Sequence, residues 1–328
     1  MNNPESAGHW QQQPLPWQMA ALDQLGSRLM LNQLPHALLI TGAQGLGKTL
    51  FAESLAALIL CAAPVDNRAC GRCESCCVAQ GGGHGDYRWL APPPDKRAIG
   101  IDAVRSVLSF VQKTAGYGRY KVLVVAPAEA MTTGAANALL KTLEEPAGNS
   151  VLLLVSHRPS DLAATVRSRC QQVILPTPAA HDAAAWLKDS LASAGFERSP
   201  ETILHALDAA NNRPLAAFNL VTSDTLDGVH AQMLLIQGLI AGRVSVAEAN
   251  SGLGAESPEA LLTAVYHALA AQLGKASAAD LTRLGPPLFS AIDMVVKMLA
   301  AVRAGVNPAK DILYGEVCRK IAGIFPAR

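Results

Sequence analysis

The chain has 328 residues, which is long enough for two or three domains with hydrophobic cores of their own. A net charge of +1 disfavours a protein that grips DNA alone through a strongly basic surface, and 50% hydrophobic residues with only 5% aromatic ones favour a soluble, helix-rich protein. No uncharged apolar run reaches the roughly 18 residues of a membrane span, and the N-terminus has no basic-then-apolar signal pattern. We therefore expect a cytoplasmic protein with no membrane partner.

A glycine-rich loop follows the first predicted strand. Four apolar residues at 37–40 predict a short buried strand, and an apolar-periodic helix follows over 50–60. Between them, residues 42–49 (GAQGLGKT) fit G-x-x-x-x-G-K-[ST] at every fixed position. Glycines let the backbone turn its N–H groups towards a phosphate, and the helix start adds partial positive charge. Lys48 would reach the β- and γ-phosphates, while the Thr49 hydroxyl would coordinate Mg²⁺. The candidate residues for binding ATP or ADP are Gly42, Gly45, Gly47, Lys48 and Thr49.

The cysteines indicate a metal site. Seven cysteines in a chain without an export signal argue for metal binding or reactivity rather than disulfides. Four of them have the spacing C-x8-C-x2-C-x2-C, which can fold back around one tetrahedral Zn²⁺. The predicted ligands are Cys61, Cys70, Cys73 and Cys76. Cys77 could replace Cys76, and a set of reduced thiols without metal is the alternative. Four thiolates leave no open position for water, so the zinc would be structural.

Strands and helices alternate through the first half of the chain. Further strands are predicted at 87–90, 121–125, 151–155 and 172–175, with helices at 18–34, 101–114 and 137–143. This alternation predicts a parallel sheet covered by helices on both faces. After Pro176-Thr-Pro178 only helical patterns remain, near 226–241, 258–273, 279–303 and 308–324 in the last part.

Three domains are expected from this organisation. Residues 1–178 would form the α/β P-loop domain, with the zinc module inserted at about 61–85. Residues 179–222 would form a small helical domain. Residues 223–328 would form a larger helical domain, so that two all-α domains follow the sheet.

These segments together resemble one family, the bacterial clamp-loader subunits of DNA polymerase III within the AAA+ class. The matching stretches are HALLITGAQGLGKT at 36–49, the four-cysteine module, NALLKTLEEP at 137–146 and SRC at 168–170. They span about residues 15–178. The resemblance implies an AAA+ domain, a helical lid and a C-terminal collar for oligomerisation. Two subunit types of the family share this layout: an ATP-hydrolysing motor, and a delta-prime type that holds the ring in place.

One difference separates these two types. In an active AAA+ ATPase the strand after the P-loop region ends in Asp-Glu, which helps hold magnesium and polarises the attacking water. Counting back from NALLKTLEEP, Ala126 and Pro127 occupy these positions, and neither can bind a metal or accept a proton. Glu129 lies two residues further on, where a slipped alignment would recruit it as the base. We expect instead that Pro127 redirects the backbone there. The sequence therefore predicts a subunit that binds nucleotide without hydrolysing it, with Mg²⁺ poorly held.

The SRC segment predicts a role in a neighbouring subunit. In this family its arginine is a finger that enters the neighbour's ATP site, and Arg169 matches it. An arginine supplied in trans can contribute roughly 10³ to 10⁵ in rate. The alternative is a surface arginine in a solvated turn beside Arg167. Cys170 is expected to pack in the core. Arg213 falls near a nucleotide-sensing arginine of active members, but Pro214 disturbs the match and a solvent-facing side chain is expected.

The resemblance thus implies a delta-prime-type subunit without independent activity in the polymerase holoenzyme. It would brace gamma/tau-type ATPase and delta-type subunits in a hetero-oligomeric ring and lend Arg169 to one of them. The assembly would place the sliding clamp on primed DNA, in the cytoplasm at the nucleoid. An autonomous motor-type ATPase is the alternative, which Ala126 and Pro127 disfavour. A zinc-ribbon DNA-binding protein is disfavoured by the near-neutral charge.

Overall fold

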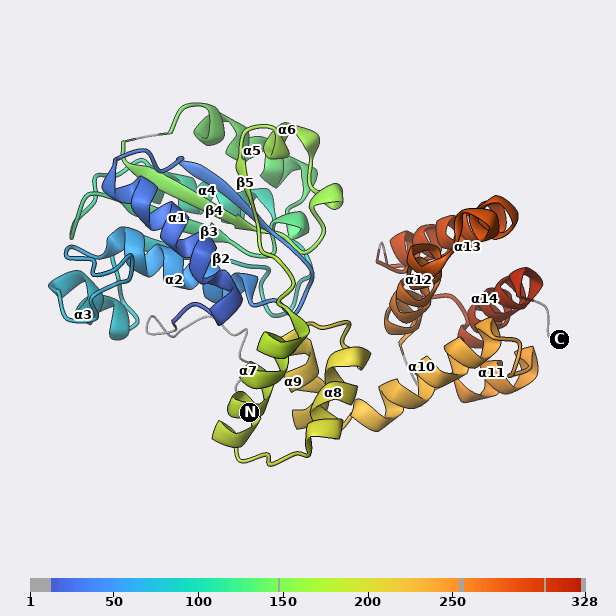
Figure 1. Cartoon of the computed structure of the whole chain (residues 1–328). Coiled ribbons are helices and arrows are strands. Elements are labelled where there is room, and N and C mark those ends of the chain that lie inside the picture. The colour runs from blue at the N-terminus through green and yellow to red at the C-terminus, as the bar shows by residue number, and fades with distance from the viewer. Residues whose placement is uncertain (1–12, 147, 254–256, 304, 326–328) are drawn as a thin grey trace. The chain divides into compact units, whose positions relative to one another are not determined.

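The computed structural model describes residues 13–146, 148–253, 257–303 and 305–325. The chain forms two compact units that divide between Thr222 and Ser223. The first unit contains the sheet, and the second is built from helices (Figure 1).

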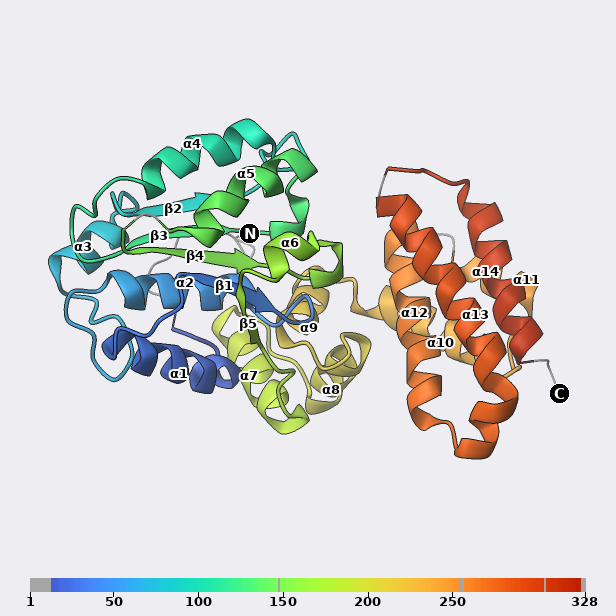
Figure 2. The same cartoon turned by 90° about the horizontal axis from the view of Figure 1, so that it is seen from above.

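A five-stranded parallel sheet lies at the centre of the first unit, in the strand order β2-β3-β4-β1-β5 (Figure 2). The strands are β1 (Ala37–Thr41), β2 (Tyr87–Leu90), β3 (Lys121–Val125), β4 (Ser150–Val155) and β5 (Gln171–Ile174). β1 pairs with β4 on one side and with β5 on the other. Because β1, β3 and β4 are buried along their whole length, they appear in the sequence as continuous apolar runs. The predicted parallel sheet is confirmed.

Helices cover both faces of this sheet (Figure 2). They are α1 (Met19–Met30), α2 (Lys48–Leu60), α3 (Glu74–Gln80), α4 (Ile101–Val111), α5 (Thr133–Glu144) and α6 (Ala164–Arg167). Successive residues of β1 point to opposite faces. Leu38 and Ile40 join a core with α1 and α2, whereas Ala37 and Leu39 join a core with α4 and α5. Single 3₁₀ turns are η1 (Pro16–Gln18), η2 (Ala128–Ala130) and η3 (Pro159–Asp161).

The helix after the glycine-rich loop is the most buried of the first unit. Every residue of α2 except Thr49 is buried, so this helix has no polar face. It begins directly after Gly47 and ends at Leu60, and the N–H of the next residue, Cys61, donates to the carbonyls of the last turn. The helix therefore carries the loop at one end and the first cysteine of the metal module at the other.

A buried ion pair fixes the edge of the sheet. The Lys121 ammonium lies 2.9 Å from an oxygen of Asp86, and both side chains are almost fully buried. Burial by itself acts to raise the pKa of Asp86. The N–H groups of Tyr117 and Gly116 and the Lys121 charge outweigh it, so that the pKa of Asp86 is lowered. Because every oxygen of the carboxylate has a donor, the pair holds β2, β3 and the loop before β3 together.

Three helices follow the sheet within the first unit: α7 (Ala180–Ser193), α8 (Pro200–Ala209) and α9 (Pro214–Thr222). They pack against one another, and Ser199 caps α8 by accepting the N–H of Thr202 at 3.2 Å. The start of α9 lies against the glycine-rich loop, because the N–H of Leu215 donates to the carbonyl of Gly45.

The second unit is helical. Its elements are α10 (Leu226–Ile240), α11 (Val246–Gly252), α12 (Pro258–Lys275), α13 (Ala278–Arg303) and α14 (Lys310–Ile324). One helix of the described part, residues 281–303 of α13, is long and apolar enough to cross a membrane by length and composition. Its residues Leu288, Val295 and Leu299 are buried in the core of the unit, around the fully buried Tyr314. A core helix of a helical domain has the same composition.

Candidate functional site

The glycine-rich loop joins β1 to α2 at the carboxyl edge of the sheet. Gly42, Gly45 and Gly47 have φ angles of +144°, +86° and +75°. A Cβ at Gly47 would lie 2.5 Å from the Leu15 side chain, and one at Gly45 would lie 2.8 Å from Ala216. Both the backbone angles and the close neighbours therefore require glycine.

Lys48, the lysine of the G-x-x-x-x-G-K-[ST] pattern, lies against the loop itself. Lys48 is 2% exposed, and its Nζ donates to the carbonyl oxygens of Gly42 at 2.9 Å and Ala43 at 2.7 Å. These contacts hold the ammonium over the loop, where phosphates are bound in this motif.

The other carbonyl groups of the loop accept hydrogen bonds from residues that lie outside the loop. The Gln18 amide donates to the carbonyls of Leu46 at 2.9 Å and Gly47 at 2.8 Å, and Gln18 is fully buried. The N–H of Leu215 donates to Gly45 at 3.2 Å. Since the carbonyl groups face the protein, the loop turns its N–H groups the other way, as an anion-binding nest does.

Trp17 supports the same loop. Its indole Nε1 donates to the Leu46 carbonyl at 3.1 Å, and its ring meets the edge of Trp186 on α7 with 5.5 Å between centroids. A small apolar cluster surrounds this contact, formed by Leu15, Leu50 and Leu215. The segment before α1 and the helices after the sheet therefore enclose the loop together.

Arg213 differs from the expectation of a solvent-facing side chain. Its Nε donates to the Ala210 carbonyl at 2.6 Å, and its Nη1 reaches the Gln44 carbonyl of the loop at 3.5 Å. Burial lowers the pKa of Arg213. The expectation was wrong because α9 begins at Pro214 against the loop, which carries the preceding residue inwards.

Further polar residues follow β3 and β4 at the carboxyl edge of the sheet. Ala126 is buried after β3, so no carboxylate follows that strand directly. Glu129 lies on η2, and its Oε1 accepts the backbone N–H of His157, after β4, at 3.0 Å. Burial lowers the pKa of His157 to about 4, with Lys48 acting in the same direction and Glu129 against it.

The lowered pKa of His157 predicts a pH dependence. In the folded chain the imidazole stays neutral down to about pH 4, whereas in the unfolded chain it takes up a proton near pH 6.5. Folding therefore loses stability as the pH falls from 6.5 towards 4, and keeps all of this contribution above 6.5.

An NMR titration of the histidine ring protons tests it, with His157→Gln used to assign the signal. We expect the His157 signal to remain unchanged between pH 8 and 6. A midpoint near 6.5 would show that the imidazole is solvated rather than buried beside Lys48.

The four predicted metal ligands come together in the structure. The sulfur atoms of Cys61, Cys70, Cys73 and Cys76 all lie within 4.8 Å of one another, and the Cys61 and Cys73 sulfurs are 3.9 Å apart. Four thiolates at 2.3 Å from a tetrahedral Zn²⁺ have sulfurs about 3.8 Å apart. The cluster therefore fits a zinc ion. Cys77 lies outside it, is exposed, and its thiol faces the Arg72 carbonyl at 3.7 Å.

Backbone groups already favour the thiolate form at this cluster. The N–H of Cys70 donates to the Cys61 sulfur at 3.2 Å, and the N–H of Cys73 to the Cys70 sulfur at 3.3 Å. Burial acts to raise the pKa of Cys73, but N–H donors from Cys76 and Ala62 outweigh it and lower the pKa to about 6. Burial raises the pKa of Cys61 and Cys76, whose charge a bound cation would compensate.

A second network anchors the module to the core. The Ser75 hydroxyl donates to the Leu60 carbonyl at 2.6 Å and contacts His84 Nε2 at 2.8 Å. His84 Nδ1 accepts the N–H of Asp86 at 3.0 Å, so Nε2 carries the proton and donates to Ser75. The module is thereby tied to the end of α2 and to the start of β2.

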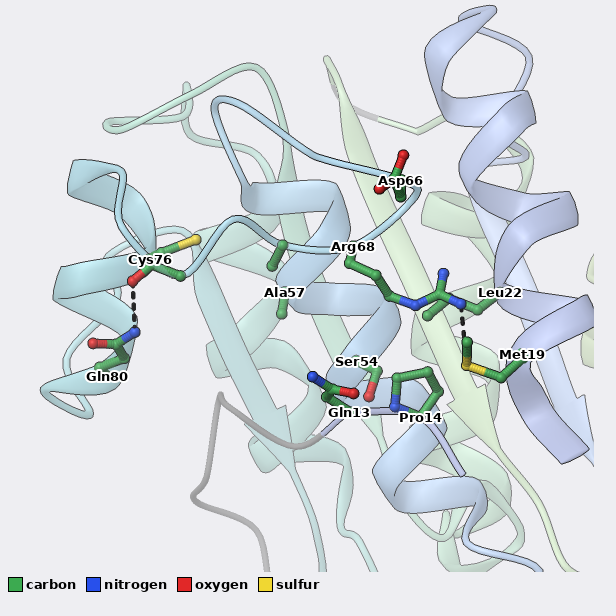
Figure 3. Close-up of a pocket in the computed structure, with 12 residues that line it drawn as sticks. Gln13, Pro14, Met19, Leu22, Ser54, Ala57, Asp66, Arg68, Cys76 and Gln80 are labelled. Carbon is green, nitrogen blue, oxygen red and sulfur yellow. Dashed lines mark hydrogen bonds between the residues drawn. The ribbon is translucent and has the colours of Figure 1, made fainter. Parts of the chain in front are cut away.

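A cavity of about 490 Å³ lies beside the module (Figure 3). Arg68 forms one wall, pairs with Asp23 of α1 at 2.7 Å, and donates to the Met19 sulfur at 3.1 Å. The loop of the metal module is therefore fixed to α1 as well as to α2.

The cysteine cluster predicts one Zn²⁺ per chain, measured by metal analysis of protein purified without chelators. Cys76→Ser should remove most of the zinc and loosen residues 61–85, while the sheet stays folded because the module is an insertion. Cys77→Ser is the matched control and should keep full occupancy. Full zinc in Cys76→Ser together with loss in Cys77→Ser would assign the fourth ligand to Cys77.

Arg169 lies just after α6 with its side chain 35% exposed. Its Nε and Nη2 contact Oε1 of Glu144, at the end of α5, at 2.8 and 2.5 Å, and its Nη1 donates to the Thr165 carbonyl at 2.9 Å. Arg167 beside it donates to the Pro159 carbonyl instead. Cys170 packs against the core, and burial raises its pKa to about 11.

Sequence patterns do not single out three residues of these sites: Gln18, Glu144 and His157. Gln18 and Glu144 act through contacts with residues more than 20 positions away, which no local spacing reveals. His157 lies two residues after the apolar run of β4. The rule that ligands bind at the carboxyl ends of parallel strands could have drawn attention to it.

The family model and the curated relatives that match this chain are both subunits of DNA polymerase III. Residues 17–179 match the family described as DNA polymerase III, delta subunit. "DNA polymerase III subunit delta'" of Pseudomonas aeruginosa is 43% identical over 205 residues, 62% of this chain and 60% of that protein. The same subunit of Escherichia coli is 36% identical over 209 residues, 64% of this chain and 61% of that protein. The matches thus span about three fifths of these relatives' length. A solved gamma subunit-related protein of Thermotoga maritima aligns with a TM-score of 0.44 and 17% identity, over 93% of this chain and 99% of that one.

Proposed function

Because this chain belongs, through its sheet domain, to the family of bacterial DNA polymerase III delta-prime subunits, we propose that it is a clamp-loader subunit that binds nucleotide without hydrolysing it. Its task is to brace the ATPase subunits of the ring. One observation carries this proposal: an enclosed, complete phosphate loop stands beside a strand that ends in Ala126 and Pro127 instead of two carboxylates.

The geometry of the loop supports nucleotide binding. Gly42, Gly45 and Gly47 allow the turn. Because the loop carbonyls are hydrogen-bonded to the surrounding protein, the N–H groups on the opposite side of the loop are left for a phosphate. On binding, Lys48 exchanges the carbonyls of its own loop for phosphate oxygens, and Thr49 in the first turn of α2 is placed for a metal.

The end of β3 supports the absence of hydrolysis. Phosphoryl transfer depends on positioning and on electrostatic stabilisation of the transferred group. Neither a methyl group at Ala126 nor the ring of Pro127 can hold Mg²⁺ or orient a water molecule. The same two residues argue against the motor-type ATPase as the alternative.

Arg169 supports action in trans. Within the described part of the chain its guanidinium pairs with Glu144, and the two side chains are 35% and 51% exposed. An exposed ion pair contributes about 0–1 kcal/mol, so a triphosphate on a neighbouring subunit can replace Glu144 at little cost. The planar fork of arginine then grips phosphate oxygens as two parallel donors.

The domains follow the same assignment. Residues 1–178 act as the AAA+ domain, 179–222 as a lid that covers the loop through Leu215, and 223–328 as a collar. Exposed Phe289 and Val296 on α13 offer apolar surface to the collars of other subunits. The partners are gamma/tau-type ATPase and delta-type subunits in the cytoplasm, and the assembly acts on the sliding clamp and primed DNA.

Nucleotide binding is tested on the isolated chain. We expect it to bind ADP or ATP with measurable affinity by titration calorimetry, and to release no phosphate above background. Lys48→Ala should weaken binding at least tenfold, because the ammonium is the main positive charge of the loop. Steady turnover that disappears in Lys48→Ala would make the chain a motor-type ATPase.

The role of Arg169 is tested in an assembly reconstituted with motor and delta-type subunits. Arg169→Ala should leave folding nearly unchanged, since an exposed side chain rarely contributes more than about 0.5 kcal/mol. ATP hydrolysis stimulated by DNA and clamp should fall clearly but incompletely, because one ATP site borders this subunit. Arg169→Lys should rescue it poorly.

Arg167→Ala is the matched control, two residues away and also exposed, and should retain wild-type hydrolysis. Wild-type ATPase and clamp loading by the Arg169→Ala assembly would contradict the assignment. So would a loss that size-exclusion analysis traces entirely to failed assembly.

A further inference from the structure

Glu129 and His157 form a polar pair that the proposed function does not use. They follow β3 and β4, which are neighbours in the sheet, and β4 also pairs with β1, the strand that leads into the phosphate loop. The backbone N–H of His157 fixes Glu129 Oε1 at 3.0 Å. The pair therefore stands at the carboxyl edge of the sheet, next to the loop, where open parallel sheets bind ligands.

One polar atom of each of these two side chains has no hydrogen-bond partner within the described residues. Glu129 Oε2 and His157 Nδ1 are buried and have no hydrogen-bond partner among the residues that the structure describes. A buried carboxylate oxygen without a donor is costly, and such groups in a native structure call for a bound water, an ion or a ligand. The two atoms therefore mark a polar position beside the loop.

Two charged groups near this position are Lys48 and Glu129, whereas His157 is neutral. Lys48 and Glu129 both lie close enough to His157 to act on its pKa, in opposite directions, and that pKa of about 4 leaves the imidazole neutral at physiological pH. The Glu129 carboxylate is therefore a negative group at the same edge of the sheet as the Lys48 ammonium, since both act on His157. At Ala126 and Pro127 no second carboxylate is present to hold a Mg²⁺ ion that could neutralise a further anion.

We propose that Glu129 makes the phosphate loop a nucleoside diphosphate site, because its carboxylate stands where a third phosphate would approach Lys48. The lysine of such a loop reaches the β- and γ-phosphates. A diphosphate ends at the first of these positions and brings no further charge towards Glu129. A triphosphate brings its terminal charge against Glu129 in a poorly hydrated place, where like charges repel strongly.

This inference rests on the proposed nucleotide binding and adds to it a preference for a diphosphate over a triphosphate. It gives the subunit a resting state that does not alternate with ATP binding in the ring. The bracing role then follows from the bound ligand as well as from the missing carboxylates, because a diphosphate has no γ-phosphate to be hydrolysed.

The affinities of the full chain for ADP and for ATP decide the matter, each measured by calorimetry with Mg²⁺ and in buffer without added Mg²⁺. No chelator is used, so that the cysteine cluster keeps its metal. We expect ADP to bind about tenfold or more tightly than ATP in the wild type. Glu129→Gln should tighten ATP about tenfold and change ADP less than about twofold. Glu197→Gln, in the exposed loop before α8, is the matched control and should preserve the preference.

Each other outcome overturns the inference in a recognisable way. Equal affinities in the wild type, or a preference that Glu129→Gln leaves unchanged, refute the role of Glu129 while nucleotide binding stands. ATP binding that strengthens with Mg²⁺ and weakens in Glu129→Gln would make Glu129 a metal-holding residue instead. Binding of neither nucleotide refutes both the inference and the proposed binding. The wild-type ratio is decisive even if Glu129→Gln does not fold.

Discussion

The buried amide of Gln18 is the contact on which the phosphate loop depends. Its two N–H groups bind the carbonyls of Leu46 and Gly47, and its oxygen accepts the N–H of Leu15 at 3.0 Å. All its hydrogen-bonding groups are therefore used inside the protein. Leaving one buried polar partner without a bond costs about 1–3 kcal/mol. The amide thus joins the segment before α1 to the loop between β1 and α2, and the direction of the loop's N–H groups follows from it.

The residues that follow β3 and β4 determine what the site could do with a bound nucleotide. The loop offers the same binding groups to a diphosphate and a triphosphate, so it does not itself determine what happens to the nucleotide. At the end of β3 the carboxylates required for hydrolysis are replaced by Ala126 and Pro127. At the end of β4 His157 orients Glu129 through its backbone N–H. In the function that we propose, a few residues at one sheet edge would therefore separate a bracing subunit from one that consumes ATP.

The sequence predicts the sheet well because β1, β3 and β4 are buried on both faces and consist of apolar runs. The glycine loop and the four cysteines are also predictable, since their spacing is local. The helices α3 and α11 are missed, because seven residues give little periodicity. The inward position of Arg213 and the pairing of Glu129 with His157 are not predictable from spacing. They depend on which strands become neighbours and on where α9 begins.

The two sites lie at opposite ends of α2, a helix of 13 residues and therefore about 20 Å long. This helix is buried on all sides and cannot rotate or slide without disturbing both faces of its surroundings. The cysteine module is attached where the helix ends, and its own anchors run through Ser75 and His84 to the sheet edge rather than to the loop. A lineage could therefore shorten, exchange or lose its cysteines over time without changing the glycine-rich loop at the other end of the helix. The reverse does not hold, because a substitution at Gly45 or Gly47 would collide with the segments that close over it.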